Sequence, residues 1–170
     1  MDNQEILNFK MPRYDRLPLI DLYIDQVLEY IDTIFAPLRL SGSEKLLTAS
    51  MINNYVKKGV VPAPVKKKYS RRHIAYIIIV YISKQIFTID EISRMIQVQM
   101  STFDIKTTYD YMCGELEEIL YSVFGSQPLA PDSTKTNAPE RYFVRNTLMA
   151  FVHKIYTQKL LNLYFMEDEK

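Results

Sequence analysis

The sequence predicts an all-α fold, built as a single helical domain over residues 1–170. Apolar residues recur three or four positions apart along nearly the whole chain, which is the spacing of one buried side of a helix. Hydrophobic residues make up 48% of the composition, enough for a 170-residue chain to bury a core. Only VVPAPVKKKY at 60–69 favours extended chain, so the only strand structure that we expect is a short β wing.

The N-terminal half begins with a predicted helix over residues 20–35, which carries one apolar stripe and lies between Pro18 and Pro37. Thr48 is expected to cap a second, shorter helix. That helix should stop at Gly59, because glycine adopts the left-handed conformation after a helix end without steric cost.

Two further helix starts are marked by capping residues. Ser70 is expected to cap a third helix, which is strongly apolar. Thr88 and Glu91 form a capping box, in which each side chain satisfies a backbone N–H of the first turn. The box should open a short fourth helix that ends near Ile96.

The C-terminal segment, residues 102–166, is predicted to be helical as well. A long amphipathic helix covers 103–124, and the turn-forming residues of 125–140 indicate an exposed loop. The last helix, 141–166, is apolar around most of its circumference. Such a helix lies either in the centre of a core or against another chain, so the C-terminal segment is a candidate dimerisation segment.

Charge is distributed unevenly along a chain whose formal net charge is only +1. Nine basic residues and no acidic residue lie between Lys45 and Ile89, whereas the remainder holds twelve basic and twenty acidic residues. A basic segment of this kind indicates a polyanionic partner such as nucleic acid, although a basic run is also common on a solvated surface. Both interpretations stay open at this point.

Candidate DNA contacts lie in the second helix and in the basic segment that follows it. Asparagine can pair with adenine through two hydrogen bonds, and lysine contacts guanine or phosphate. Lysines in an extended wing and arginines at the next helix start would follow the phosphate backbone. The alternative is that these are ordinary exposed residues that maintain solubility. The candidates are Ser50, Asn53, Asn54, Lys57, Lys58, Lys66, Lys67, Lys68, Arg71 and Arg72.

The order of elements over roughly residues 48–97 carries a family resemblance. Its residues are Asn54-Tyr55, Lys58-Gly59-Val60, Pro62, Tyr69-Ser70, Ile74 and Glu91-Ile92. They resemble the DNA-binding region of MerR-type transcriptional regulators, which implies a winged helix-turn-helix over 45–97 with a recognition helix, a wing and a supporting helix. The chain departs from that pattern at PLRLSGSEKLL, where the MerR type has a short first helix and a tight turn. Either the end of helix 20–35 supplies the supporting element, or the motif is degenerate.

Nearly the whole chain carries a second resemblance, in the segments LPLIDLYIDQVLEYI, LTASMINNYVKKG and PAPVKKKYSRRHIAYI. By these segments the chain resembles, more closely, a bacterial family known as domain of unknown function 1836. That resemblance implies no established activity beyond the same helix-turn-helix.

Enzymatic chemistry is not indicated by this sequence. Its four glycines form no phosphate-binding loop and no nucleophile elbow. His73 and His153 are far apart, and neither stands in a metal-ligand spacing with Cys113 or a carboxylate, so we expect no metal and no cofactor. We expect His73 to face solvent or phosphate, and the acidic cluster at 115–118 to be a solvated helix face.

The cellular location follows from three features of the sequence. No apolar run is long enough to span a bilayer, and the N-terminus lacks the pattern of a signal peptide. The lone Cys113, interpreted as a structural thiol, suits a reducing compartment. We therefore expect a cytoplasmic protein with no membrane partner.

Two functional hypotheses remain. The first is a transcriptional regulator that binds double-stranded DNA as a homodimer, with the twofold symmetry that palindromic sites require. The second is a helical protein-interaction or structural domain that keeps a winged-helix shape without binding DNA. Under either hypothesis, Tyr55 and Tyr69 are expected to pack the second helix and the wing against the third helix.

Overall fold

The protein is described by a computed structural model over residues 3–39, 47–133 and 138–167. It is mostly helical, with one small antiparallel sheet, which confirms the predicted helical fold class. The elements in chain order are α1 (Gln4–Leu7), the 3-10 helix η1 (Tyr14–Arg16), β1 (Leu22–Tyr23), α2 (Ile24–Phe35), the 3-10 helix η2 (Ala36–Leu38), α3 (Ala49–Lys57), β2 (Lys68–Tyr69), α4 (Arg71–Ser83), α5 (Ile89–Thr102), α6 (Ile105–Gly125) and α7 (Pro139–Glu167).

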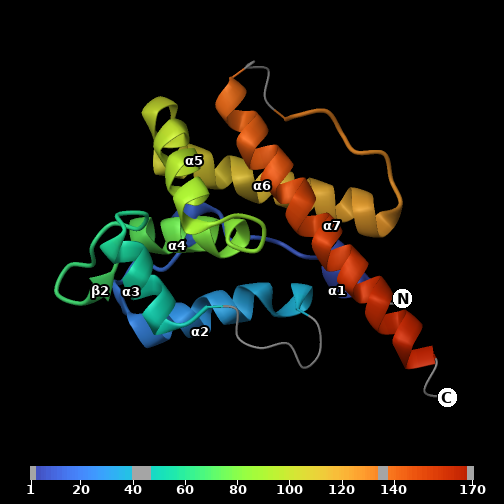
Figure 1. Cartoon of the computed structure of the whole chain (residues 1–170), viewed down its shortest axis with the longest axis horizontal. Coiled ribbons are helices and arrows are strands. Elements are labelled where there is room, and N and C mark those ends of the chain that lie inside the picture. The colour runs from blue at the N-terminus through green and yellow to red at the C-terminus, as the bar shows by residue number, and fades with distance from the viewer. Residues whose placement is uncertain (1–2, 40–46, 134–137, 168–170) are drawn as a thin grey trace.

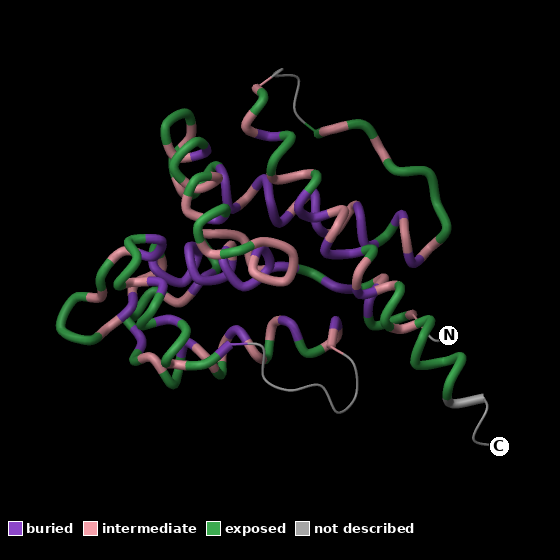
Figure 2. The backbone as a smooth tube through the Cα atoms, viewed as in Figure 1, coloured by how far each residue is buried: buried purple, intermediate pink, exposed green. Residues whose placement is uncertain are grey.

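The hydrophobic core forms around α4, whose sequence is apolar on nearly every side. Every residue from His73 to Ser83 is buried, except Ile79, as the purple stretch of α4 in Figure 2 shows. α6 packs along α7 and also contacts α4 and α1 (Figure 1). Phe35 of α2 stacks on Tyr81 of α4 with ring centroids 4.4 Å apart. Burial of this apolar surface is the main favourable term for folding.

The start of the first predicted helix is wrong. α2 begins at Ile24, and the side chains of Leu19 and Ile20 are 86% and 74% exposed. The backbone just before α2 is extended and not helical, because β1 forms an antiparallel pair with β2, which lies far along the chain. The helix then starts where the Tyr23 N–H donates to Gln26 Oε1 at 2.9 Å, as half of a capping box.

Both predicted ends of the second helix are confirmed in α3. Thr48 Oγ1 accepts the Met51 N–H at 3.3 Å, as an N-cap should. Gly59 has φ +71°, and it turns the chain so that the Val60 N–H donates to the Tyr55 carbonyl at 2.9 Å. A Cβ at Gly59 would meet no atom within 4 Å, so the positive φ, and not crowding, favours glycine here.

The predicted caps of α4 and α5 are also present. Ser70 forms a capping box with His73, and Thr88 forms one with Glu91. α5 is longer than expected, because no glycine or proline interrupts residues 97–102. It stops only where the next residues form the cap of α6.

The acidic cluster on α6 is not a solvated face, and that expectation is wrong. The Glu117 carboxylate accepts from Arg13 at 2.6 Å and from the Met11 N–H at 2.9 Å, which ties the N-terminal segment to α6. Burial alone would raise the pKa of Glu117, but these hydrogen bonds hold it below its usual value. Glu115 is buried beside Arg145 of α7. Because these partners lie far away in the sequence, no local pattern predicts that the two glutamates are covered.

The last helix behaves differently in its two halves. The first half of α7 contributes Leu148, Phe151, Val152 and Ile155 to the core. The second half runs past the rest of the molecule in Figure 1, and its apolar side chains are exposed. We call this exposed segment the α7 tip; its apolar residues are Leu160, Leu161, Leu163, Tyr164 and Phe165. Even α7, however, is not apolar enough to cross a bilayer, and the same holds for every other helix in the described ranges.

Cys113 should be inert in the folded protein. Its side chain is buried in the core, and burial raises the pKa of the thiol to about 12, although the nearby Arg13 charge acts in the opposite direction. Because only the thiolate attacks, we expect labelling by a disulfide reagent at pH 8 to be about a thousandfold slower in the native protein than in denaturant. A rate of labelling that is similar in the two states would contradict this prediction.

Candidate nucleic-acid interface

α3 presents a polar face to solvent. Ile52 and Tyr55 are buried and attach the helix to the core. On the opposite side, residues at the 3- and 4-residue spacing of one helix face are exposed. These residues are Ser50, Asn53, Asn54 and Lys57, four of the candidates that the sequence suggests.

The segment after α3 ends in a tight turn that displays two lysines. Val65 and Lys68 exchange backbone hydrogen bonds of 3.0 Å and 2.9 Å, with Lys66 and Lys67 between them. Both central residues have positive φ, 49° and 63°, which is the pattern of a type I′ turn. Left-handed backbone at a non-glycine residue costs about 1 to 2 kcal/mol. This turn therefore places two lysines in a backbone conformation that lysine disfavours. We call it the lysine turn.

The strand that follows the lysine turn is anchored to the N-terminal segment. β2 pairs antiparallel with β1, with Leu22 opposite Tyr69 and Tyr23 opposite Lys68. The Lys68 ammonium lies 5.1 Å from the centroid of the Tyr23 ring, a cation–π contact. This pairing could not be predicted from the sequence, because a two-residue strand has no periodicity to detect. Lys68 therefore supports the sheet and is only half exposed.

The buried His73 of α4 forms a hydrogen bond to the segment that precedes the lysine turn. The Ser70 N–H donates to His73 Nδ1 at 3.0 Å, so the ring proton lies on Nε2 and is directed to the Ala63 carbonyl at 3.0 Å. The Tyr69 ring packs edge-on against the same imidazole, with centroids 5.8 Å apart. The expectation that His73 faces solvent or phosphate is wrong, because its position in the first turn of α4 directs it back toward the chain. The expected packing of Tyr69 on the third helix is confirmed, and Tyr55 is likewise buried.

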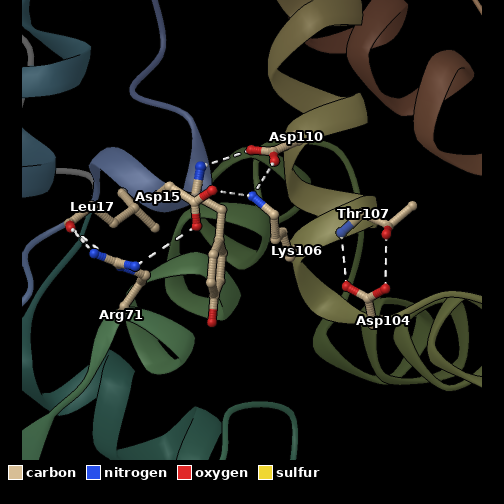
Figure 3. A network of polar contacts seen from close by, with 8 residues as sticks. Asp15, Leu17, Arg71, Asp104, Lys106, Thr107 and Asp110 are labelled. Atoms are coloured by element: carbon tan, nitrogen blue, oxygen red, sulfur yellow. Dashed lines mark hydrogen bonds and ion pairs between the residues drawn. The ribbon is translucent and has the colours of Figure 1, made fainter.

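The two arginines at the start of α4 have different environments. Arg71 donates to the Leu17 carbonyl at 3.3 Å and 3.2 Å and lies 3.8 Å from the Asp15 carboxylate, as the close view in Figure 3 shows. Asp15 also accepts from Lys106 at 2.5 Å, and this hydrogen bond holds the pKa of Asp15 below its usual value. Arg71 thus joins η1 to α4, whereas Arg72 is exposed and lies over the Tyr76 ring.

The remaining candidate, Lys58, is exposed and forms an ion pair with Asp90 at 3.3 Å. The structure therefore divides the sequence candidates into three groups. Lys68 and Arg71 are half-buried and bind neighbouring parts of the chain, while Lys58 is exposed but paired. The others are exposed: Ser50, Asn53, Asn54, Lys57, Lys66, Lys67 and Arg72.

These exposed residues occupy one end of the molecule. Figure 1 shows α3, the loop that contains the lysine turn and the first turn of α4 together at the end opposite the α7 tip. The tip of the projecting loop, residues 65–67, is exposed, and Figure 2 shows the outermost part of this loop in green. Within the described part of the chain, no three His, Cys, Asp or Glu side chains gather where they could hold a metal ion.

This arrangement defines a small helical domain in which an exposed polar helix is followed by a basic turn supported by a two-stranded sheet. The chain belongs to the family described as Domain of unknown function (DUF1836), whose family model matches residues 12–112. That match confirms the closer of the two resemblances over residues 12–112 and not over nearly the whole chain. The matched range includes every candidate residue, whereas the MerR-type resemblance stays a prediction. The searches of curated proteins and of solved structures found no significant match.

Proposed function

We propose that the protein is a DNA-binding transcriptional regulator of MerR-like winged-helix type, with α3 as its recognition helix and the lysine turn as its wing. The observation that supports this most is that α3, with its exposed polar face, and the loop that carries the lysine turn lie at the same end of the molecule, within a segment that has no acidic residue from Lys45 to Ile89. A polyanion that binds this segment is therefore not repelled by any carboxylate within it.

In this proposal α3 enters the major groove. An α-helix fits that groove, and the groove edge of each base pair carries a distinct pattern of donors and acceptors. Asn53 and Asn54 can read adenine, and Ser50 can donate or accept toward a base edge or phosphate. The buried Ile52 and Tyr55 make the helix rigid enough to fix the register of these contacts.

The basic residues act as a clamp on the phosphate backbone. Lys66 and Lys67 at the tip of the lysine turn contact one stretch of backbone, and Lys57 and Arg72 contact another. Each such contact releases counterions, so affinity falls steeply with salt. Lys68 and Arg71 have a positioning role, because their side chains already bind within the chain. A regulator of this type works in the bacterial cytoplasm.

The first prediction concerns base reading by α3. Asn53→Ala should cost about 1 to 3 kcal/mol on the preferred site and little on random duplex, because base-edge contacts specify sequence while phosphate contacts only position the protein. A genomic fragment library supplies the preferred site, and titrations compare the two duplexes. Asn146→Ala, an exposed amide in the first half of α7 and outside the α7 tip, is the matched control and should bind like the wild type. An equal loss on both duplexes would assign Asn53 to the phosphate clamp instead.

The second prediction concerns self-association through the α7 tip. Five large apolar side chains are exposed there, and a second copy that covers them would give the twofold symmetry of a palindromic site. We expect a particle of about twice the 20.0 kDa chain mass at micromolar concentration, and a monomer for Leu161→Asp with Phe165→Asp. Leu19→Asp, a control on another exposed leucine, should stay dimeric.

The α7 tip also favours the second candidate function, a helical protein-interaction domain, if its partner is a different protein. Size measurement separates these cases, since a wild-type particle of 20.0 kDa at micromolar concentration contradicts the homodimer.

A further inference from the structure

A small cavity lies between α5 and α7, over a floor formed by α4 and α6. It encloses about 50 Å³ and its walls include Ile82, Met95, Gln99, Met112, Val144 and Leu148. One side reaches the surface, where Phe143 is 47% exposed. The described residues that line it include no charged side chain. A neutral, largely apolar occupant is therefore the kind that this cavity accepts without a desolvation penalty.

One buried polar atom in the cavity wall has no hydrogen-bond partner among the described residues. The Gln99 side chain is 6% exposed, and its amide N–H donates to Thr108 Oγ1 at 3.3 Å. Its carbonyl oxygen accepts no hydrogen bond from the described residues. An unsatisfied buried acceptor costs about 1 to 3 kcal/mol. A ligand that donates to this oxygen removes that cost, because the oxygen has already lost its hydrogen bonds to water on folding.

The other polar residues of the wall are Ser83, Thr108 and Thr147, and among the described residues none of them has a buried side-chain atom without a hydrogen-bond partner. The Thr147 hydroxyl donates to the Phe143 carbonyl at 2.6 Å, and the Thr108 hydroxyl already accepts from Gln99. A buried water needs two to four polar partners, and this wall offers only one open acceptor. The wall is therefore a poor site for a water molecule. A molecule with an apolar body and a single donor matches the wall better.

We propose that this cavity is a binding site for a small neutral molecule that has an aliphatic body and one hydroxyl or N–H donor directed at Gln99 Oε1. The flexible side chains of Met95 and Met112 can adjust to its shape, and the open side leaves room for a chain longer than the enclosed volume. This proposal does not depend on DNA binding.

The test compares two isomers on the full chain, hexan-1-ol and 1-methoxypentane, which have the same heavy atoms but only one of which has a donor. Affinities come from titrations followed by NMR, with the methionine methyl groups as reporters of the cavity. We expect hexan-1-ol to bind about fivefold to tenfold more tightly than the ether. Gln99→Leu should reduce that ratio to one or below, since the hydroxyl of hexan-1-ol then loses its acceptor and is buried without a hydrogen bond. Gln97→Leu, the same change on the exposed side of α5, should leave the ratio unchanged.

The proposal is overturned if neither isomer shifts the methionine methyl signals of the wild type, which would leave the cavity to water alone, or if the two isomers bind equally. Val144→Phe, which fills the cavity from α7, provides a second variant. It should abolish binding of both isomers, and retained binding would place the ligand elsewhere.

Discussion

Replacing Lys66 and Lys67 together by glutamate should lower the affinity for duplex DNA on the order of a hundredfold at about 50 mM salt. The reason is that each phosphate contact contributes about 0.9 to the slope of log K against log salt concentration, so two contacts account for about two orders of magnitude at this salt. The loss should be similar on every sequence, and the slope should fall by about 2 in magnitude. Fluorescence titrations at several salt concentrations measure both quantities.

The folded state should tolerate this double replacement, because both side chains lie at the tip of an exposed turn. The control is Lys159→Glu in the second half of α7, at the opposite end of the molecule. It should change the affinity much less, and because Lys159 adjoins the apolar residues of the α7 tip, size measurement must first show that this variant keeps the particle size of the wild type. An equal effect of Lys159→Glu would show that net charge, and not the lysine turn, determines binding.

Arg145→Met should lower the free energy of unfolding by about 3 to 5 kcal/mol, the largest stability effect that we expect. Glu115 is only 2% exposed, and its carboxylate lies 2.8 Å from Arg145 Nη1. The second carboxylate oxygen accepts from the Ser133 N–H and hydroxyl at 3.2 Å and 2.7 Å. Removing the arginine therefore leaves a buried charge without its counterion. Urea denaturation followed by circular dichroism measures the loss.

The partner variant separates the ion pair from simple packing. Glu115→Leu combined with Arg145→Met removes both charges, so the double variant should be more stable than Arg145→Met alone. Arg94→Met, the same substitution on the exposed side of α5, should change stability by less than about 0.5 kcal/mol. A loss below about 1 kcal/mol for Arg145→Met would contradict the assigned role of this pair.

Local signals predicted three of the helix starts correctly. The caps at Thr48, Ser70 and Thr88 are all found where the sequence places them, and Gly59 ends α3 as expected. These features depend on a few neighbouring residues, whose backbone groups must be satisfied within one turn. The sequence is sufficient for them.

Errors arose wherever a residue has a partner far along the chain. Ile20 has helical spacing, but the backbone that follows it pairs with β2 and delays the helix. In the sequence, Glu115 and Glu117 have the pattern of a solvated helix face. In the structure, α7 covers Glu115 and the N-terminal segment covers Glu117. The same holds for the candidate site, where Arg71 is indistinguishable from Arg72 in sequence, yet only Arg71 is bound to Leu17. Tertiary contacts, not local pattern, decide such cases.

The most direct test of the central claim is the salt dependence of wild-type binding to duplex DNA. With Lys57, Lys66, Lys67 and Arg72 each contacting a phosphate, a plot of log K against log salt concentration should have a slope of about −4. Binding should be tightest at the lowest salt and should occur on random duplex as well as on a preferred site. If the wild type binds no duplex of any sequence at low salt, the lysine turn and α3 form only a solvated surface and the proposed function is wrong.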